Sequence, residues 1–197
     1  MKNLIKKSLV VLTLMFALLS NASEKDRSIK IIAHDSKVVQ LYLNNHDGSS
    51  ELVLKDAYGI QLYKYAIKGK EFSKTFDLSE LPDGNYFFEL NGQTKIKTLP
   101  FSVALKKVEF NDETIIFKPI VRLKSKVVYI SKFTLKEDEL AIFLFDDNRN
   151  LLFSKKLSGK NSLSLKLNLK NLEPGSYKLQ LKSDGKLYNE IIEVQNL

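Results

Sequence analysis

The chain contains no cysteine and no tryptophan, and it has only two histidines, four prolines and eight glycines among 197 residues. Without cysteine it cannot form disulfides, thiolate metal sites, a cysteine nucleophile or a lipid-modified N-terminal cysteine. The low glycine and proline content excludes collagen-like and low-complexity architectures. What remains is an ordinary globular composition, 44% hydrophobic and 27% charged, with a formal net charge of +8.

The first 22 residues have the organisation of a secretory signal peptide. Lys2, Lys6 and Lys7 precede an apolar run at 9–19, and the small residues that follow predict cleavage between Ala22 and Ser23. An uncleaved anchor is the alternative, but the run is shorter than the roughly 20 residues that span a bilayer. We therefore expect no transmembrane segment in the mature chain. Export without any cysteine indicates a Gram-negative periplasm or a bacterial cell surface.

The remaining sequence contains an internal repeat with a period of about 90 residues. Ser-Lys-Val-Val at 36–39 recurs at 125–128, and the apolar run at 52–56 aligns with 142–146, each ending in aspartate. So long a period indicates domain duplication rather than a solenoid. The predicted division is a signal peptide at 1–22, a first module at 23–104 and a second module at 105–197.

Both modules have the pattern of an all-β protein. Leu163, Leu165, Leu167 and Leu169 alternate with polar residues, which puts one face of a strand on a core and the other in water. Turn signals rich in Asp, Asn and Gly separate several such short runs, and no convincing helix pattern occurs outside the signal peptide. Short strands with this punctuation are typical of a sandwich or a barrel.

A Leu-x-x-Gly-x-Tyr element occurs once in each module. In a sandwich this element carries the chain between sheets: the leucine anchors one sheet, the glycine takes a strained bend, and the tyrosine hydroxyl binds upstream backbone. We interpret both copies as structural tyrosine corners, made of Leu81, Gly84 and Tyr86 and of Leu172, Gly175 and Tyr177. The predicted fold is two tandem immunoglobulin-like, fibronectin-type antiparallel β-sandwiches.

This succession of apolar strand, Asp-rich turn, apolar strand and corner resembles small immunoglobulin-like modules of secreted Bacteroidetes proteins. It is similar in particular to the C-terminal sorting modules of type IX secretion cargo. The resemblance covers about 38–103 and 127–194. It implies a β-sandwich fold and an address in the cell envelope.

Candidate residues for chemistry are few. His34 and His46 are each followed by an aspartate, so a His/Asp metal or acid–base site is one reading and polar loop residues are the other. We favour the second, because no metal-ligand spacing is present and the second module has no histidine. The chain also lacks a P-loop, a dinucleotide fingerprint and a Gly-x-Ser-x-Gly motif. We expect no catalytic residue, no metal and no cofactor.

Aspartates recur at the predicted turns. They could supply the hard oxygen ligands that calcium needs, with 146–148 as the best candidate. They could equally cap their own turns, which we favour because the matching turn of the first module keeps a single aspartate. The aspartates concerned are Asp56, Asp83, Asp146, Asp147 and Asp184.

The excess positive charge lies in the second module, where residues 105–197 carry 17 basic and 12 acidic side chains. Its lysines could form a patch for a polyanion such as lipopolysaccharide or capsule. They could instead protect strand edges from pairing with other chains. Nucleic acid is disfavoured, because the chain is exported and offers few aromatics for base stacking. The lysines form two groups: Lys124, Lys126 and Lys132, and Lys155, Lys156 and Lys160.

The sequence as a whole predicts an exported, non-enzymatic binding or structural module of the bacterial cell envelope. Its partner would be an envelope protein or an anionic surface polymer, although no ligand-binding residue is assigned. A type IX sorting module and a carbohydrate-binding module are the alternatives, and the latter would present an exposed aromatic platform. An enzyme would need a polar pocket with perturbed acids, which no motif indicates.

Overall fold

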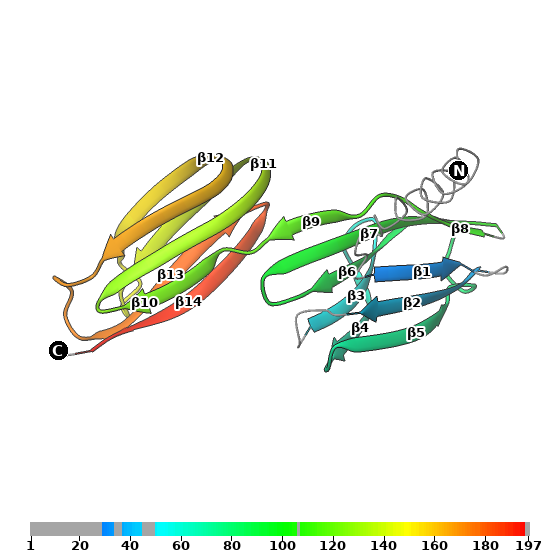
Figure 1. Cartoon of the computed structure of the whole chain (residues 1–197), viewed down its shortest axis with the longest axis horizontal. Coiled ribbons are helices and arrows are strands. Elements are labelled where there is room, and N and C mark those ends of the chain that lie inside the picture. Colours follow the sequence, from blue (N-terminus) through cyan, green and yellow to red (C-terminus); the bar gives the residue numbers. More distant parts are fainter. Residues whose placement is uncertain (1–28, 34–36, 45–49, 106, 196–197) are drawn as a thin grey trace, which may run out of the picture.

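The computed structural model describes residues 29–33, 37–44, 50–105 and 107–195 (Figure 1). The predicted cleavage site at Ala22 and Ser23 lies outside the described residues, as do His34 and His46. Within these ranges the chain forms fourteen strands in three sheets, and all strand pairs are antiparallel. The all-β class predicted from the alternating patterns is confirmed.

The first module is a sandwich of two sheets. Strands β1, β2 and β5 form a three-stranded sheet, and the path β4-β3-β6-β7, extended by two short strands that pair with β7, forms a six-stranded sheet. Buried side chains from both sheets meet in one core, including Leu41 of β2, Leu52 of β3 and Phe88 of β6. The strands are β1 (Ile29–Ala33), β2 (Val38–Asn44), β3 (Ser50–Asp56), β4 (Gln61–Ile67), β5 (Glu71–Asp77), β6 (Gly84–Asn91) and β7 (Lys95–Ala104).

The second module repeats this pairing scheme with fewer, longer strands. Residues 127–134 of β11 pair with 161–168 of β12, as β2 pairs with β5, whereas 138–145 pair with 151–159, as β3 pairs with β4. Register shifts at Thr134/Asp138 divide the two halves of the hairpin. Several short strands were expected here, but two strands of 19 and 18 residues run through both layers of the module, which is one five-stranded sheet folded over on itself. The strands are β10 (Ile120–Lys124), β11 (Val127–Phe145), β12 (Leu151–Asn168), β13 (Gly175–Ser183) and β14 (Lys186–Val194).

Two short strands connect the modules by turning back along β7. Strand β8 (Lys107–Phe110) pairs with the end of β7 at residues 101–104, and β9 (Thr114–Phe117) pairs with its beginning at residues 95–98. The Lys118 N–H then binds the Thr94 carbonyl at 2.8 Å, beside the β6–β7 turn. By pairing, β8 and β9 belong to the six-stranded sheet of the first module, although the predicted module boundary falls at 105. Because of this return, the second module starts beside the β6–β7 turn and not at the far end of β7 (Figure 1).

Each corner tyrosine binds the backbone four residues upstream. The Tyr86 hydroxyl donates to the Pro82 carbonyl at 2.9 Å, and the Tyr177 hydroxyl donates to the Glu173 carbonyl at 2.8 Å. Both rings are buried, and Leu81 and Leu172 pack against the respective cores. The strained bend expected at the glycines is absent: Gly175 has φ of 159°, which is nearly extended, and Gly84 has no positive φ.

Candidate functional site

A groove of about 1030 Å³ lies on the outer face of the sheet formed by β10, β11 and the second half of β12. The side chains of Val121 and Ile130 point to the opposite, core-facing side. Because side chains alternate along a strand, Arg122, Tyr129 and their neighbours two residues away face outward. The groove therefore lies on the solvent-facing side of strands whose opposite side packs against the core.

Cross-strand register places three side chains in one row across this groove. Arg122 of β10 is the partner of Tyr129 in β11, and Tyr129 is the partner of Lys166 in β12. The Lys166 Nζ lies 5.6 Å from the centre of the Tyr129 ring. The next row holds Ser131 and Ser164, which contribute hydroxyl groups. The row thus presents an aromatic ring between a guanidinium and an ammonium.

The groove is basic and partly apolar. Arg122, Lys124 and Lys166 line it, and none of the described residues that line it carries a carboxylate. Tyr129 keeps 39% of its surface exposed. A planar guanidinium can bind a carboxylate, sulfate or phosphate through two hydrogen bonds, and a tyrosine offers a flat apolar face beside them. The arrangement is chemically suited to an anion attached to a ring-shaped or extended molecule.

The first group of predicted lysines is split by the structure. Lys124 lines the groove, and Lys126 sits in the β10–β11 turn with φ of 58°. The placement of Lys132 in a surface patch is wrong, because its side chain is 1% exposed and faces the interior. Its ammonium binds Asp138 and Asp184 and donates to the Ser183 hydroxyl at 2.7 Å. The two partly buried carboxylates neutralise the charge of Lys132, which explains why a lysine occupies a core-facing position.

The carboxyl group of Asp138 is tuned by this cluster. Burial alone would raise the pKa of Asp138. The hydrogen bonds from Lys132 and from the Glu139 N–H, together with the positive charge of Lys132, hold the pKa below its ordinary value. Asp138 is therefore ionised at neutral pH, at the end of the register shift between Thr134 and Asp138.

The second group of predicted lysines follows the free edge of β12, a strand that pairs only with β11. Lys156 binds Glu139 at 2.7 Å, and Lys160 lies 3.9 Å from Glu137. Their side chains are exposed, as is Lys155. Charged side chains at an open edge oppose the addition of further strands.

Two of the predicted turn aspartates, Asp56 and Asp146, bind the backbone of their own turns. Asp56 accepts from the Ile60 N–H at 2.8 Å, and Asp146 accepts from the Asn150 N–H at 2.7 Å in the matching turn of the second module. The Asn150 side-chain hydrogen bond lowers the pKa of Asp146. Asp83 accepts from the Leu105 N–H, and Asp147 is exposed. In the described part of the chain, no three His, Asp or Glu side chains gather closely enough to hold a metal ion.

The ion pairs between the two modules, centred on Glu89, were not predicted from the sequence. Glu89 of β6 is only 8% exposed, and its two oxygens bind Lys55 of β3 and Lys186 of β14, each at 3.2 Å. Desolvation and the nearby Lys186 lower the pKa of Lys118 in the connecting segment. Burial, followed by the charges of Asp184, Glu89 and Asp138, raises the pKa of Tyr188 to about 12.

Comparison with known proteins identifies no relative by sequence. No family profile matches the chain, and no curated protein matches it. No helix in the described residues is long and apolar enough to cross a membrane.

Three solved structures match the chain at low similarity. A biofilm-associated protein BSP domain has 17% identity and a TM-score of 0.31, over 85% of this chain and 29% of that one. Dimeric latent PorU from Porphyromonas gingivalis has 9% identity and a TM-score of 0.31, over 88% and 21%. The chicken CNTN1 FN1–FN3 domains have 9% identity and a TM-score of 0.27, over 85% and 64%. This chain spans less than two thirds of each, and such scores carry no information about activity or ligand.

Proposed function

We propose that this protein is an exported, non-enzymatic binding module of the bacterial cell envelope, and that it holds an anionic surface polymer in the groove around Tyr129. The observation that carries the proposal is the row formed by Arg122, Tyr129 and Lys166 on an outer sheet face. Export rests on the signal-like segment at 1–22.

The geometry of the row suits an acidic polysaccharide. Neighbouring strands lie about 4.8 Å apart, so the three side chains span about 10 Å across the sheet. A chain lying across them meets a cation, a ring face and a second cation in turn. Ser131 and Ser164 in the next row can bind sugar hydroxyls. Lys124 extends the positive charge along β10.

A neutral glycan is the second candidate ligand, and its site would be the outer face of the other layer of this module, where β11 pairs with β13 and β13 with β14. Phe143 and Phe145 of β11 lie there with ring centres 6.4 Å apart and an interplanar angle of 28°. The Gln180 amide of β13 donates to Asn189 of β14 at 3.1 Å beside them. Rings next to an amide pair could stack on and bind an uncharged sugar.

The test compares binding of the chain that starts at Ser23 to alginate, dextran sulfate and neutral dextran by isothermal titration calorimetry. The variant pair Arg122→Ser and Lys166→Ser, combined, removes both cations of the row. Lys178→Ser combined with Lys182→Ser is the matched control, because both lysines are exposed on β13, in the other layer of the module.

We expect the wild type and the control to bind a charged polymer, and the groove variant to lose about tenfold or more in affinity. Binding should weaken with added salt, since the contacts are exposed. No binding of either charged polymer, or equal losses in both double variants, would reject the groove. Preference for neutral dextran would favour the second candidate.

A further inference from the structure

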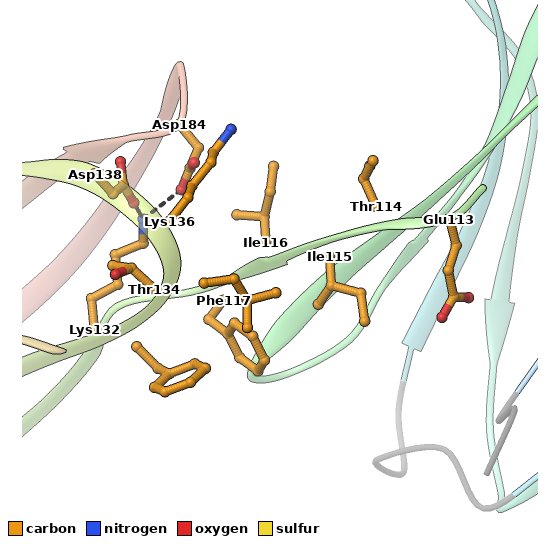
Figure 2. Close-up of a pocket in the computed structure, with 12 residues that line it drawn as sticks. Glu113, Thr114, Ile115, Ile116, Phe117, Lys132, Thr134, Lys136, Asp138 and Asp184 are labelled. Carbon is orange, nitrogen blue, oxygen red and sulfur yellow. Dashed lines mark hydrogen bonds and ion pairs between the residues drawn. The ribbon is translucent and has the colours of Figure 1, made fainter. Parts of the chain in front are cut away.

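An open slot of about 280 Å³ lies where the chain passes from the six-stranded sheet of the first module to the second module. Its walls are the consecutive residues 113–117 on one side and 132–136 on the other (Figure 2). Successive side chains of a strand point to opposite faces, so a cavity touched by five residues in a row lies along a strand's edge. Both walls of the slot are therefore strand edges.

Both edges are open in the described structure. Strand β9 pairs on one side only, with β7. Residues 132–134 of β11 pair with β12, whereas the pairing of β11 with β10 begins only at Ser131. Pro119 separates β9 from β10, and a proline has no N–H with which to continue a ladder. The chain before β10 therefore pairs with β7 as strand β9 and does not continue along β11. One edge of β9 and one edge of β11 at residues 132–134 stay unpaired in the described structure.

Part of the slot is lined by apolar side chains. Phe117 and Phe133 meet edge to face there, with ring centres 4.9 Å apart. Phe133 remains 50% exposed and Leu135 66% exposed, although both are large apolar residues. The Thr134 hydroxyl, in a residue only 4% exposed, has no hydrogen-bond partner in the described structure. The slot therefore holds apolar surface and a polar atom whose hydrogen bonding is incomplete.

The remaining charges favour a basic occupant. Glu113, Asp138 and Asp184 line the slot with Lys132 and Lys136. Two of the three carboxylates share the charge of Lys132, and Glu113 lies at the opposite end of the slot from Lys136 (Figure 2). The charged side chains that line the slot therefore include one more acid than base. A backbone edge beside an apolar recess and an acidic rim is the arrangement used when an extended peptide adds to a sheet.

We propose that this slot binds an extended peptide segment of a partner protein. The peptide pairs its main chain with the open edge of β9, places an apolar side chain against Phe117, Phe133 and Leu135, and directs a basic side chain toward the acidic rim. This goes beyond polymer binding and uses none of the groove residues, so either proposal can fail alone.

The test is a titration of the isotope-labelled chain from Ser23 with a capped synthetic hexapeptide, Val-Lys-Val-Thr-Val-Lys, followed by amide chemical shifts. The matched probe is the same peptide with alternate backbone nitrogens methylated, which removes main-chain donors but keeps every side chain. Leu135→Ser is the slot variant. Ile191→Ser is its control, because Ile191 is an apolar residue with 62% exposure on the far strand β14.

The proposal predicts shifts at 113–117 and 132–136 that saturate with the unmethylated peptide, and at least a fivefold weaker response to the methylated one. Leu135→Ser should weaken binding by at least fivefold, whereas Ile191→Ser should leave it unchanged. No shift in these segments, or equal responses to both peptides, would overturn it. The same shifts on concentrating the protein alone would also overturn it, since the occupant would then be a second copy.

Discussion

Glu89 of the first sandwich binds Lys186 of the second sandwich at 3.2 Å, across the junction of the two modules. The same carboxylate binds Lys55 of its own module, and it is nearly buried. A buried carboxylate held between two ammonium groups fixes the positions of both, because losing either partner leaves charge poorly compensated. Strand β9 runs back along β7 to the β6–β7 turn, so the second module starts near β6, where Glu89 lies.

Replacement of Glu89 by glutamine should lower the free energy of unfolding by about 1–3 kcal/mol, since two charge-assisted hydrogen bonds are lost from a buried site. Urea denaturation monitored by circular dichroism measures it. Glu51→Gln is the control, because Glu51 binds Lys64 at an exposed position and should cost less than about 0.5 kcal/mol. Equal effects of the two substitutions would show that the joint does not stabilise the molecule.

Loss of a corner hydroxyl should destabilise either module by a similar amount. Tyr177→Phe removes the hydrogen bond to Glu173, and Tyr86→Phe removes the bond to Pro82, while each ring stays in place. We expect about 1 kcal/mol for each, as for a typical intramolecular hydrogen bond. Thermal melts identical to that of the wild type would argue that the hydroxyls bind water equally well.

Removal of the buried cation should be more costly. Lys132→Ala leaves Asp138 and Asp184 without the cation that they share, and we expect a loss of about 3 kcal/mol or more. Lys155→Ala, at an exposed edge position, should change stability by less than about 0.5 kcal/mol. Equal effects of both variants on stability would contradict the buried assignment.

The stability contributed by Asp138 should depend on pH in a defined direction. Its pKa is lower in the folded state than in the unfolded chain, so the stabilisation is present above the unfolded value of about 3.9 and is lost as pH falls toward the folded value. The difference in unfolding free energy between wild type and Asp138→Asn should therefore be constant near neutral pH and shrink below about pH 4. A difference that grew in acid would reverse the assigned sign.

The module boundary is tested by two fragments. Residues 119–197 contain every strand of the second sandwich, whereas 105–197 also carry β8 and β9 without their partner β7. We expect both fragments to fold, and the amides of 107–117 to exchange rapidly in the longer one. Protection of those amides, or a shorter fragment that stays unfolded, would place β8 and β9 in the second folding unit.

Sequence pattern predicted the strands well because alternation is a local property. It failed at Lys132, where a lysine and not Phe133 occupies the core-facing position. The cause is distant in sequence: Asp184 reaches Lys132 from the β13–β14 turn, and a register shift brings Asp138 beside it. The row of Arg122, Tyr129 and Lys166 was missed for a related reason, since only the cross-strand register makes these residues neighbours.

The most direct test of the proposed function is a map of amide chemical shifts on the chain from Ser23 during titration with a sulfated dextran oligosaccharide. Binding in the groove predicts shifts concentrated at 120–131 and 164–166, with the Tyr129 ring among the most affected signals. Shifts confined to the face that carries Phe143 and Phe145, or an unchanged spectrum at saturating polymer, would contradict it.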